Sequence, residues 1–542
     1  MTTCSTHLAL WASLSISSLA SAAVWPKFAA NLGNTATTPA TPPTNLVATI
    51  VTNSPFLGVK LSSSLAVNYG RVFAYANGPT GTIFALDPDS LAVKWAVPVP
   101  VDDSWGWGSW ATPSVMNSSV VFAADAYLGC WNLDGSLRWQ TTLSHETVNS
   151  SPAIVGNRVI VGCFSYINTQ GGLAAFDLAT GSQLWFSVAI PNSTFSSCTP
   201  AVDEAAGRIY AACSNQVWCT DLATGQILWR ASAPGAFLQL NNVSLASGLV
   251  FAVNYDFAFS QTNLFAFNAA NGSFVWAAPC GMSDVPPAIA DTIVIHSCGD
   301  NLVPPAITAF DLFSGSQLWQ RTGLGSMYTP PAVAADVVYA AVGVYSGWSL
   351  ITMSNLTALS VRDGRILSST GTTRGGQAPA IADDVIYTAN NGTVYAYRRP
   401  QHPIFLSRFS LSINTAMPGK DKLKLLGALL ARFPFPDYGQ PVYARLGDFV
   451  FLGEPLSFSP NPDRPYAASA AIVPKKTGLL LAVTAKNGSY ANMFPNLPNS
   501  GTVRLRLPLV IITNKDIYFR SELDLTLRVK NGKVKGTGSM VL

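Results

Sequence analysis

Polar, charged and aromatic residues recur just ahead of a series of short apolar segments in this chain. They are Trp107, Trp110, His145, Glu146, Asn149, Ser197, Gln239, Asn241, Asn242, Asp284, Tyr328, Arg374 and Gln377. A carboxylate can transfer a proton, carboxylate and amide oxygens suit hard cations, arginine pairs with anions, and tryptophan offers a flat surface. These side chains could line one polar site if the apolar segments are strands around a common channel. Otherwise each is an ordinary loop residue.

Other kinds of site find little support in the sequence. The four histidines are scattered and no C-x-x-C is present, which makes a zinc site improbable. The glycines near Gly106 do not form a strand–G-x-G-x-x-G–helix unit, so no dinucleotide site is indicated. Apart from Cys4, the chain has seven cysteines, and an odd number in an exported protein leaves at least one free thiol. Cys280 and Cys298 are candidates for a local disulfide.

The composition indicates strands and turns. Of the 542 residues, 49% are hydrophobic and 11% are charged, and the apolar residues come in short Val, Ile, Ala, Phe and Tyr runs separated by Gly, Pro, Asn and Asp. One hydrophobic core rarely serves so long a chain. We therefore predict an all-β protein built from repeats or several domains.

One hairpin pattern, Ala-x-Asp-x-x-x-Gly-x-x-x-Trp, recurs along the chain. It is clearest from Ala175 to Trp185, from Thr220 to Trp229 and from Ala309 to Trp319. Trp95, Trp139 and Trp276 close three more copies, and in a seventh Ser368 replaces the tryptophan. Asp and Gly suit a tight turn, and Trp supplies a surface for stacking one repeat on the next. We predict a structural docking role for Trp95, Trp139, Trp185, Trp229, Trp276 and Trp319.

The strands that precede the hairpins give an independent count of the repeat. They begin at Ser64, Thr112, Ser151, Thr199, Val243, Pro287, Pro331 and Ala378, which are about 40 to 48 residues apart. That span holds four short strands, the content of one propeller blade. The pattern predicts an eight-bladed β-propeller, with a seven-bladed one as the alternative.

The hairpin resembles the tryptophan-docking motif of the pyrroloquinoline-quinone (PQQ) repeat family, which includes quinoprotein alcohol dehydrogenases and outer-membrane assembly lipoproteins. The resemblance covers roughly residues 24 to 397. Trp25-Pro26-Lys27-Phe28 followed by Asn34-Thr35 is similar to the start of this family's repeat region. The stretch from His145 to Gly162 is similar to a blade of the polyvinyl-alcohol-dehydrogenase-like subgroup.

The resemblance implies a possible cofactor site. By analogy with the dehydrogenases, Glu146 and Asn242 would bind calcium, Asp284 would be the catalytic base, Arg374 would pair with the carboxylates of PQQ, and Trp110 would stack on the quinone. This sequence departs from the enzymes in one respect, because none of its cysteines are adjacent and the vicinal disulfide over the quinone is missing. The same fold also serves as a scaffold without catalysis.

Both ends of the chain differ from the repeats. Residues 1–22 are predicted to be a signal peptide that ends in Ala20-Ser21-Ala22, with a buried strand as the alternative, and residues 23–50 an N-terminal arm. The propeller is predicted at 51–400. Residues 404–542 hold 18 Lys and Arg against 8 Asp and Glu, whereas the preceding residues hold 14 against 20. Alternating segments there predict a basic β-sandwich or small barrel.

Two functions are compatible with these features. The favoured one is an exported binding or scaffold protein, secreted or periplasmic, with a protein or polymer partner. The alternative is a PQQ- and calcium-dependent dehydrogenase of an alcohol or polyol. No nucleic-acid motif accompanies the basic residues, and no apolar run is long enough for a transmembrane segment.

Overall fold

The structure is a computed structural model that describes most of the chain between residues 24 and 540. The described residues are 24–40, 42–44, 46, 48–52, 64–76, 81–101, 111–147, 149–165, 170–190, 198–235, 240–255, 262–299, 305–326, 329–346, 349–370, 378–390, 393–398, 401–414, 421–429, 442–446, 449–453, 467–475, 478–488, 500–513, 518–530 and 533–540. Every regular element among them is a β-strand, as predicted. No helix in this part of the chain could therefore span a membrane.

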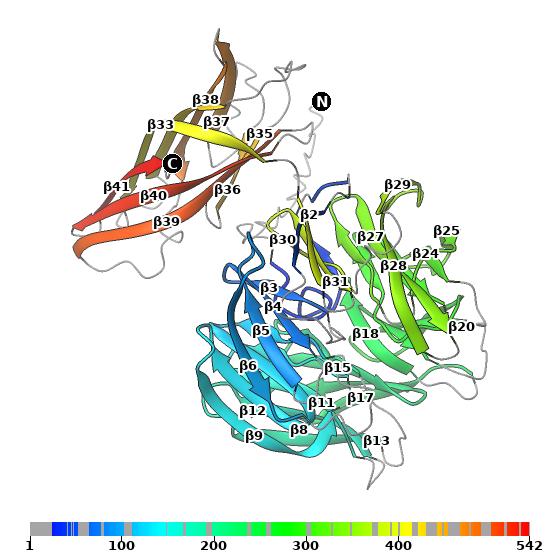
Figure 1. The fold of residues 1–542 in the computed structure, drawn as a ribbon. Helices are drawn as coiled ribbons and strands as arrows, with labels where there is room; N and C mark the ends of the chain where they lie inside the picture. Colours follow the sequence, from blue (N-terminus) through cyan, green and yellow to red (C-terminus); the bar gives the residue numbers. More distant parts are fainter. Residues whose placement is uncertain are drawn as a thin grey trace, which may run out of the picture. The chain divides into compact units, whose positions relative to one another are not determined.

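The chain divides into two compact units, one of which covers Ala23–Arg399 and the other Pro400–Leu542. Figure 1 shows both as all-strand structures, and each is described here by itself. The predicted domain boundary near residue 404 lies close to this division.

Four sheets of the first unit each consist of four consecutive antiparallel strands. Their strands are β3 (Ala66–Asn68), β4 (Arg71–Ala76), β5 (Gly81–Leu86) and β6 (Val93–Val99); β14 (Ala201–Asp203), β15 (Arg208–Cys213), β16 (Gln216–Asp221) and β17 (Ile227–Ser232); β18 (Leu240–Ala246), β19 (Leu249–Asn254), β20 (Thr262–Asn268) and β21 (Phe274–Pro279); and β22 (Ala288–Ala290), β23 (Ile293–Cys298), β24 (Ala306–Asp311) and β25 (Gln317–Thr322).

Two further groups of strands are joined into one larger sheet by the pairing of Phe164 with Glu146. They are β7 (Ser114–Met116), β8 (Ser119–Asn132) and β9 (Leu137–Thr147), then β10 (Ala153–Val155), β11 (Arg158–Ser165), β12 (Gln170–Asp177) and β13 (Gln183–Ile190). The long strand β8 takes the place of two strands of the repeat, because its first residues pair with β7 and its last ones with β9.

The last two sheets of this unit each take a strand from the N-terminus. One contains β26 (Ala332–Ala334), β27 (Val337–Ser346), β28 (Ser349–Ser360) and β29 (Ile366–Ser369), and β1 (Thr37–Thr38) lies parallel to β26. The other contains β30 (Ala380–Ala382), β31 (Val385–Asn390) and β32 (Thr393–Tyr397), and β2 (Ala48–Thr52) pairs with β32. The two ends of the repeat region are therefore joined in one sheet.

The innermost strands of these sheets form a closed ring. In chain order, β3, β7, β10, β14, β18, β22, β26 and β30 each contact the next, and β30 contacts β3. These strands match the segments predicted from the sequence to begin each repeat. The propeller prediction is confirmed, whereas the number of blades stays a prediction.

The recurring hairpin joins each sheet to the next through its tryptophan and glycine. The indole N–H of Trp319 donates to the carbonyl of Val361 at 2.7 Å, and a Cβ at Gly364 would lie 2.5 Å from the Trp319 ring. The same pair of contacts joins Trp95 to Gly135, Trp139 to Gly181, Trp185 to Gly225, Trp229 to Gly272 and Trp276 to Gly315. This is the geometry expected for interblade docking.

The aspartate of the hairpin organises the turn, as its residue type predicts. In one copy, Asp177 Oδ1 accepts hydrogen bonds from the backbone of Ala179 at 3.0 Å and of Thr180 at 2.8 Å. These bonds, led by that from Thr180, lower the pKa of Asp177. The turn therefore holds a carboxylate rather than a carboxylic acid.

The N-terminal arm runs along the inner strands at the centre of the ring. Backbone amides of six inner strands donate to its carbonyls at 2.7 to 2.8 Å, and the pairs are Val67 with Trp25, Val115 with Pro26, Val202 with Leu32, Leu245 with Gly33, Ile289 with Thr35 and Val333 with Ala36. A Cβ at Gly33 would lie 2.7 Å from the carbonyl oxygen of Leu245, so this close approach requires glycine.

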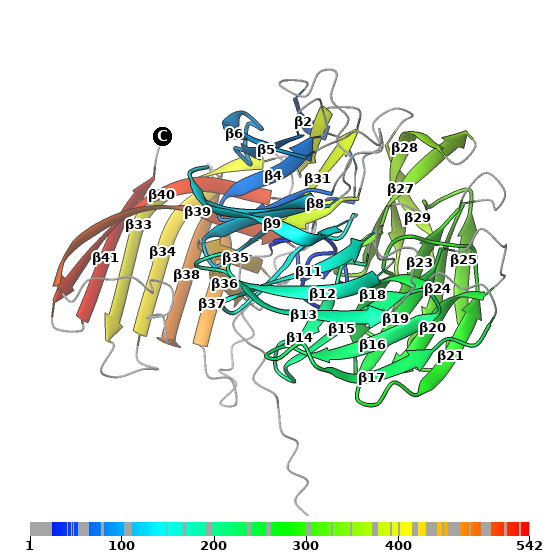
Figure 2. The same ribbon diagram turned by 90° about the horizontal axis from the view of Figure 1, so that it is seen from below.

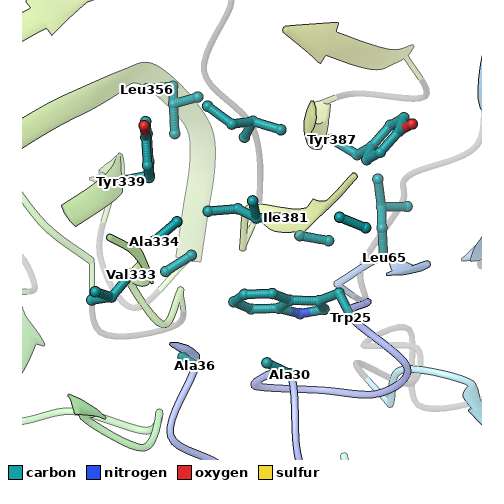
Figure 3. Close-up of a cluster of buried hydrophobic side chains, with 14 of the residues drawn as sticks. Trp25, Ala30, Ala36, Leu65, Val333, Ala334, Tyr339, Leu356, Ile381 and Tyr387 are labelled. Carbon is teal, nitrogen blue, oxygen red and sulfur yellow. The ribbon is translucent and has the colours of Figure 1, made fainter. Parts of the chain in front are cut away.

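The apolar side chains of the arm pack into the core of the sheets around them. Figure 3 shows Trp25, Ala30 and Ala36 beside Val333 and Ile381, which belong to the last two sheets. Trp25 is 1% exposed. The arm is thus part of the core of this unit.

Lys27 of the arm is fully buried. Its ammonium donates to the carbonyls of Phe28 at 3.0 Å and Asn31 at 3.1 Å, and to Oδ1 of Asn34. Burial lowers the pKa of Lys27 to about 7. The Asn34 amide in turn donates to the carbonyls of Thr199 and Val243, which connects the lysine to two inner strands.

The strands of the second unit form a single nine-stranded sheet. In chain order they are β33 (Gln401–Asn414), β34 (Asp421–Leu429), β35 (Val442–Leu446), β36 (Phe449–Gly453), β37 (Ala467–Lys475), β38 (Gly478–Gly488), β39 (Ser500–Thr513), β40 (Tyr518–Lys530) and β41 (Lys533–Met540). Their order in the sheet is β36-β35-β39-β40-β41-β33-β34-β38-β37. Figure 2 shows this sheet to be curved. The sequence predicted a sandwich or small barrel for this region.

Candidate functional site

Asp284, the predicted base, lies just ahead of the inner strand β22 and is buried. Its Oδ1 accepts a hydrogen bond from the side-chain amide of Asn241, and its backbone carbonyl accepts one from Asn242 at 2.6 Å. Burial raises the pKa of Asp284 to about 8. The carboxyl is therefore protonated at neutral pH in the arrangement seen here.

Asn242, a predicted calcium ligand, uses both ends of its side chain within the protein. Its Nδ2 donates to the carbonyl of Asp284, and its Oδ1 accepts from the backbone N–H of Thr199 at 2.8 Å. The amide oxygen that would face a calcium ion is thus occupied by a backbone donor. The side chain of Asn242 therefore connects the N-terminal ends of β14, β18 and β22 by hydrogen bonds.

The same link recurs at equivalent positions of neighbouring repeats. The backbone N–H of Thr112 donates to Oγ of Ser151 at 2.9 Å, and the N–H of Ser151 donates to Oγ1 of Thr199 at 3.0 Å. Together with the bond from Thr199 to Asn242, these contacts form a girdle of Thr112, Ser151, Thr199 and Asn242 across four successive inner strands. Asn242 occupies in its repeat the place of a serine or threonine.

Reasoning from the sequence missed the girdle, although a signal was present. Thr112, Ser151 and Thr199 each precede a proline at the start of an inner strand. Because proline has no N–H, the backbone donor at the start of these strands is that of the residue before the proline. The repeated Ser/Thr-Pro pair could therefore have indicated a connection between repeats.

Glu146, the other predicted calcium ligand, is exposed near the end of β9. Its neighbour His145 stacks on the ring of Phe186, with centroids 4.1 Å apart and planes inclined by 15°. No described hydrogen bond or ion pair connects Glu146 with Asp284 or Asn242.

The remaining predicted cofactor residues, Trp110 and Arg374, lie outside the described residues, as do Trp107, Ser197, Gln239, Tyr328 and Gln377. Their roles stay predictions. In the described part of the chain, no three His, Cys, Asp or Glu side chains come together in a way that could hold a metal ion. The calcium site therefore stays a prediction.

A second buried polar group lies beside the first, between β19, β20 and β23. Asn254 donates to Asn263 at 2.8 Å, Asn263 donates to the carbonyl of Cys280 at 2.6 Å, and Nε2 of His296 donates to the carbonyl of Gly281 at 2.9 Å. Burial lowers the pKa of His296 to about 4. This imidazole is therefore neutral at physiological pH.

The described cysteines are all free thiols. Cys280 and Cys298, which the sequence suggested as a disulfide pair, are both unbridged, so this suggestion is wrong for the structure. Burial raises the pKa of Cys163 and Cys198 to about 12 and that of Cys130 and Cys219 to about 11. Protonated, buried thiols are poor nucleophiles, so they do not add a catalytic group to the site.

Comparison with known proteins places these features in a wider group. A family model described as outer membrane protein assembly factor BamB matches residues 79–321 and 257–369. Tetrathionate hydrolase of Acidithiobacillus ferrooxidans is 25% identical over 305 residues, which is 49% of this chain and 57% of that protein. Outer membrane protein assembly factor BamB of Burkholderia pseudomallei is 26% identical over 338 residues, 60% of this chain and 81% of that protein. This chain thus spans little more than half of the hydrolase.

Solved structures show the same fold at low sequence identity. A quinohemoprotein alcohol dehydrogenase from Comamonas testosteroni has a TM-score of 0.53 and 12% identity, over 89% of this chain and 82% of that one. A europium-containing methanol dehydrogenase has a TM-score of 0.53 and 11% identity, over 75% of this chain and 90% of that one. At these identities the likeness concerns the fold alone.

Proposed function

Because this chain belongs to the family of PQQ-like repeat propellers whose model is described as outer membrane protein assembly factor BamB, we propose that it is a binding or scaffold protein that works outside the cytoplasm. The predicted signal peptide supports an exported location. The relative from B. pseudomallei supports a role at the cell envelope with a protein partner, since its name describes an assembly factor.

The girdle carries this proposal. Two of the side chains that sequence reasoning offered for a cofactor site have partners within the protein: Asn242 bonds Thr199 and the backbone carbonyl of Asp284, and the Asp284 carboxyl accepts from Asn241. A ligand shell needs oxygen atoms directed at an empty point. In this protein Oδ1 of Asn242 instead joins two inner strands. In this proposal the interior of the propeller holds the ring together, and recognition takes place on the outer surfaces.

Calorimetric titration with PQQ in the presence of CaCl₂ tests this proposal. We expect no saturable heat up to about 100 μM PQQ, which corresponds to a binding free energy weaker than roughly −5.5 kcal/mol. The matched variant is Asn242→Thr, which restores the residue type of the girdle and should fold normally. Micromolar or tighter binding by the wild type that Asn242→Thr abolishes would contradict the proposal.

A dehydrogenase is the second candidate, and the burial of Asp284 favours it. This carboxyl occupies the position predicted for the base, and its pKa is raised to about 8. It could accept a proton from an alcohol only when ionised, so any dye-linked oxidation of alcohols with added PQQ and CaCl₂ should increase as the pH rises through 8. Asp284→Asn should abolish that activity. If the activity did not change with pH and persisted in Asp284→Asn, Asp284 would be excluded as the base.

A further inference from the structure

The sheet of the second unit has two faces of opposite character. Along β40, Leu525, Leu527 and Val529 are buried, whereas Arg528 and Lys530 between and after them are exposed. On β41 the exposed residues are Lys533, Lys535 and Thr537. Successive side chains of a strand point to opposite faces, so all of the exposed cations lie on one face.

Strand register aligns these cations in a continuous row across six strands. Directly paired residues, which share a face, run in the order Thr502, Arg528, Lys535, Ser412, Lys422 and Lys486. With strands about 4.8 Å apart, the row is roughly 24 Å long. The strands β41, β33, β34 and β38 lie side by side in Figure 2.

Two neighbouring rows on the same face have the same character. One contains Arg504, Thr526, Thr537, Ser410 and Lys424, and the other contains Ser500, Lys530, Lys533 and Asn414. Across the three rows, eight residues are Lys or Arg; Asp524, paired with Arg506 and Ser539, lies in the next row of the same face. We call these three rows the cationic face.

The cationic face sets like charges opposite one another. Arg528 pairs directly with Lys535, Lys530 with Lys533, and Lys422 with Lys486. Directly opposed like charges destabilise a sheet. In the described part of the chain, the exposed Arg528, Lys530, Lys533 and Lys535 take part in none of the ion pairs, all of which lie in the propeller. Like charges set opposite one another in this way point to a negatively charged ligand.

We propose that the cationic face binds a linear anionic polysaccharide, one that carries uronate or sulfate groups. Its rows alternate cations with Ser, Thr and Asn, whose hydroxyl and amide groups match sugar hydroxyls, and the cations match the repeating acidic groups. None of the residues in the three rows is apolar or aromatic, so nothing there could insert into a bilayer or stack on bases. The proposal goes beyond the proposed function, because it concerns the other unit and would hold for an enzyme as well.

Binding of alginate and heparin to the full chain, measured over a range of NaCl concentrations, tests the proposal. We expect a Kd in the micromolar range at about 50 mM NaCl, with affinity falling steeply as salt rises, because each neutralised cation releases a counterion. The double variant Arg528→Ser/Lys535→Ser should bind at least tenfold more weakly and should lower the slope of log K against log salt by about two. Arg528→Lys/Lys535→Arg should bind like the wild type.

The control removes two positive charges from the propeller instead, with Lys94→Ser/Arg362→Ser. Both residues are exposed and both pair with nearby aspartates. An equal loss of binding in this control would assign the effect to net charge and overturn the proposal. So would absence of binding to both polysaccharides, or tighter binding to phosphatidylglycerol vesicles or duplex DNA. Circular dichroism of each variant checks that the fold is intact.

Discussion

Two buried ionisable residues, Asp284 and Lys27, are held in different ways at the centre of the first unit. Burial raises the pKa of Asp284 to about 8 and lowers that of Lys27 to about 7. Lys27 has three oxygen acceptors, so it can be stabilised as a cation despite its burial. The described contacts of the Asp284 carboxyl are limited to a single amide donor, which suits a neutral acid.

The pKa of Asp284 predicts how the stability of the protein depends on pH. The ordinary pKa of an aspartate is 3.8, so between pH 4 and pH 8 the folded protein binds a proton that the unfolded chain releases. The stability that this neutral carboxyl contributes is fully present below pH 4 and is lost as the pH rises toward 8. Asp284→Asn removes this dependence.

We therefore expect the melting temperature of Asp284→Asn to rise relative to the wild type between pH 5 and pH 8.5. At pH 8.5 the free energy of unfolding of the variant should exceed that of the wild type by a few kcal/mol at most, since one pKa unit is worth about 1.4 kcal/mol. Asp336→Asn, which alters an exposed ion pair with Arg362, is the control. A pH-independent difference between Asp284→Asn and the wild type would show that this carboxyl does not titrate as described.

The sequence indicated which polar residues lie at the start of the inner strands, but not which groups they bond. Asn241, Asn242 and Asp284 were singled out correctly as polar residues at the start of inner strands, and they do lie together. Their roles were inferred from residue type, because oxygen-bearing side chains suit calcium. Which donor already occupies an amide oxygen depends on the register between repeats, and a single sequence does not contain that information.

At the scale of the elements, the contact between tryptophan and glycine joins each sheet to the next. Trp319 is buried, donates to Val361, and covers Gly364. Trp319→Ala should therefore lower the free energy of unfolding of the propeller by about 3–5 kcal/mol, the usual cost of removing a large buried aromatic side chain. Urea denaturation measures this difference. Wild-type stability would show that the docking interpretation is wrong.

Two glycine variants test the packing of the Trp319 ring on Gly364 by changing the glycine instead of the tryptophan. Gly364 and Gly207 both have a φ of +64°, but a Cβ at Gly364 would overlap the Trp319 ring whereas nothing lies within 4 Å of a Cβ at Gly207. Gly207→Ala should cost about 1–2 kcal/mol from backbone conformation alone. Gly364→Ala should cost about 1–3 kcal/mol more, because it adds overpacking. Equal costs would argue against tight packing of the ring on Gly364.

The N-terminal arm is the other element on which the ring depends. Asn34 accepts from Lys27 and donates to two inner strands. Asn34→Ala should destabilise the propeller by several kcal/mol, since it removes one of the three acceptors of Lys27 and the amide that donates to the buried carbonyls of Thr199 and Val243, at about 1–3 kcal/mol for each lost bond. Asn31→Ala removes a half-buried side chain that bonds only within the arm, to Thr35, and should cost less. The opposite order of thermal stabilities would contradict this account of the arm.

The hairpins and inner strands could be predicted because their physical requirements leave a repeated pattern in the sequence: a turn needs Asp and Gly, and stacking needs Trp. The path of the arm left no such pattern. Its six contacts with inner strands are made by backbone carbonyls, which every residue possesses. Among the residues that make these six contacts, Gly33 alone is required by a close approach, and one glycine cannot be distinguished from a turn.

On the scale of the whole molecule, the two units differ in charge as well as in architecture. The residues before 404 hold 14 Lys and Arg against 20 Asp and Glu, and the rest hold 18 against 8. In the second unit the excess is concentrated on the cationic face, where like charges oppose one another across strands. Electrostatic repulsion should therefore destabilise the second unit in particular, and salt should relieve it.

This difference predicts two calorimetric transitions with distinct responses to salt. Each unit has its own sheet hydrogen bonds and contacts, so each should unfold as a separate cooperative transition. Raising NaCl from about 50 to 500 mM should increase the melting temperature of the second unit more than that of the propeller, because added salt shortens the Debye length, roughly 10 Å at 0.1 M and 3 Å at 1 M, and so screens the repulsion between cations on neighbouring strands. Arg528→Ser/Lys535→Ser should reduce this salt response and leave the propeller transition unchanged. A single transition at every salt concentration, shifted as a whole by the variant, would mean that the two units unfold as one.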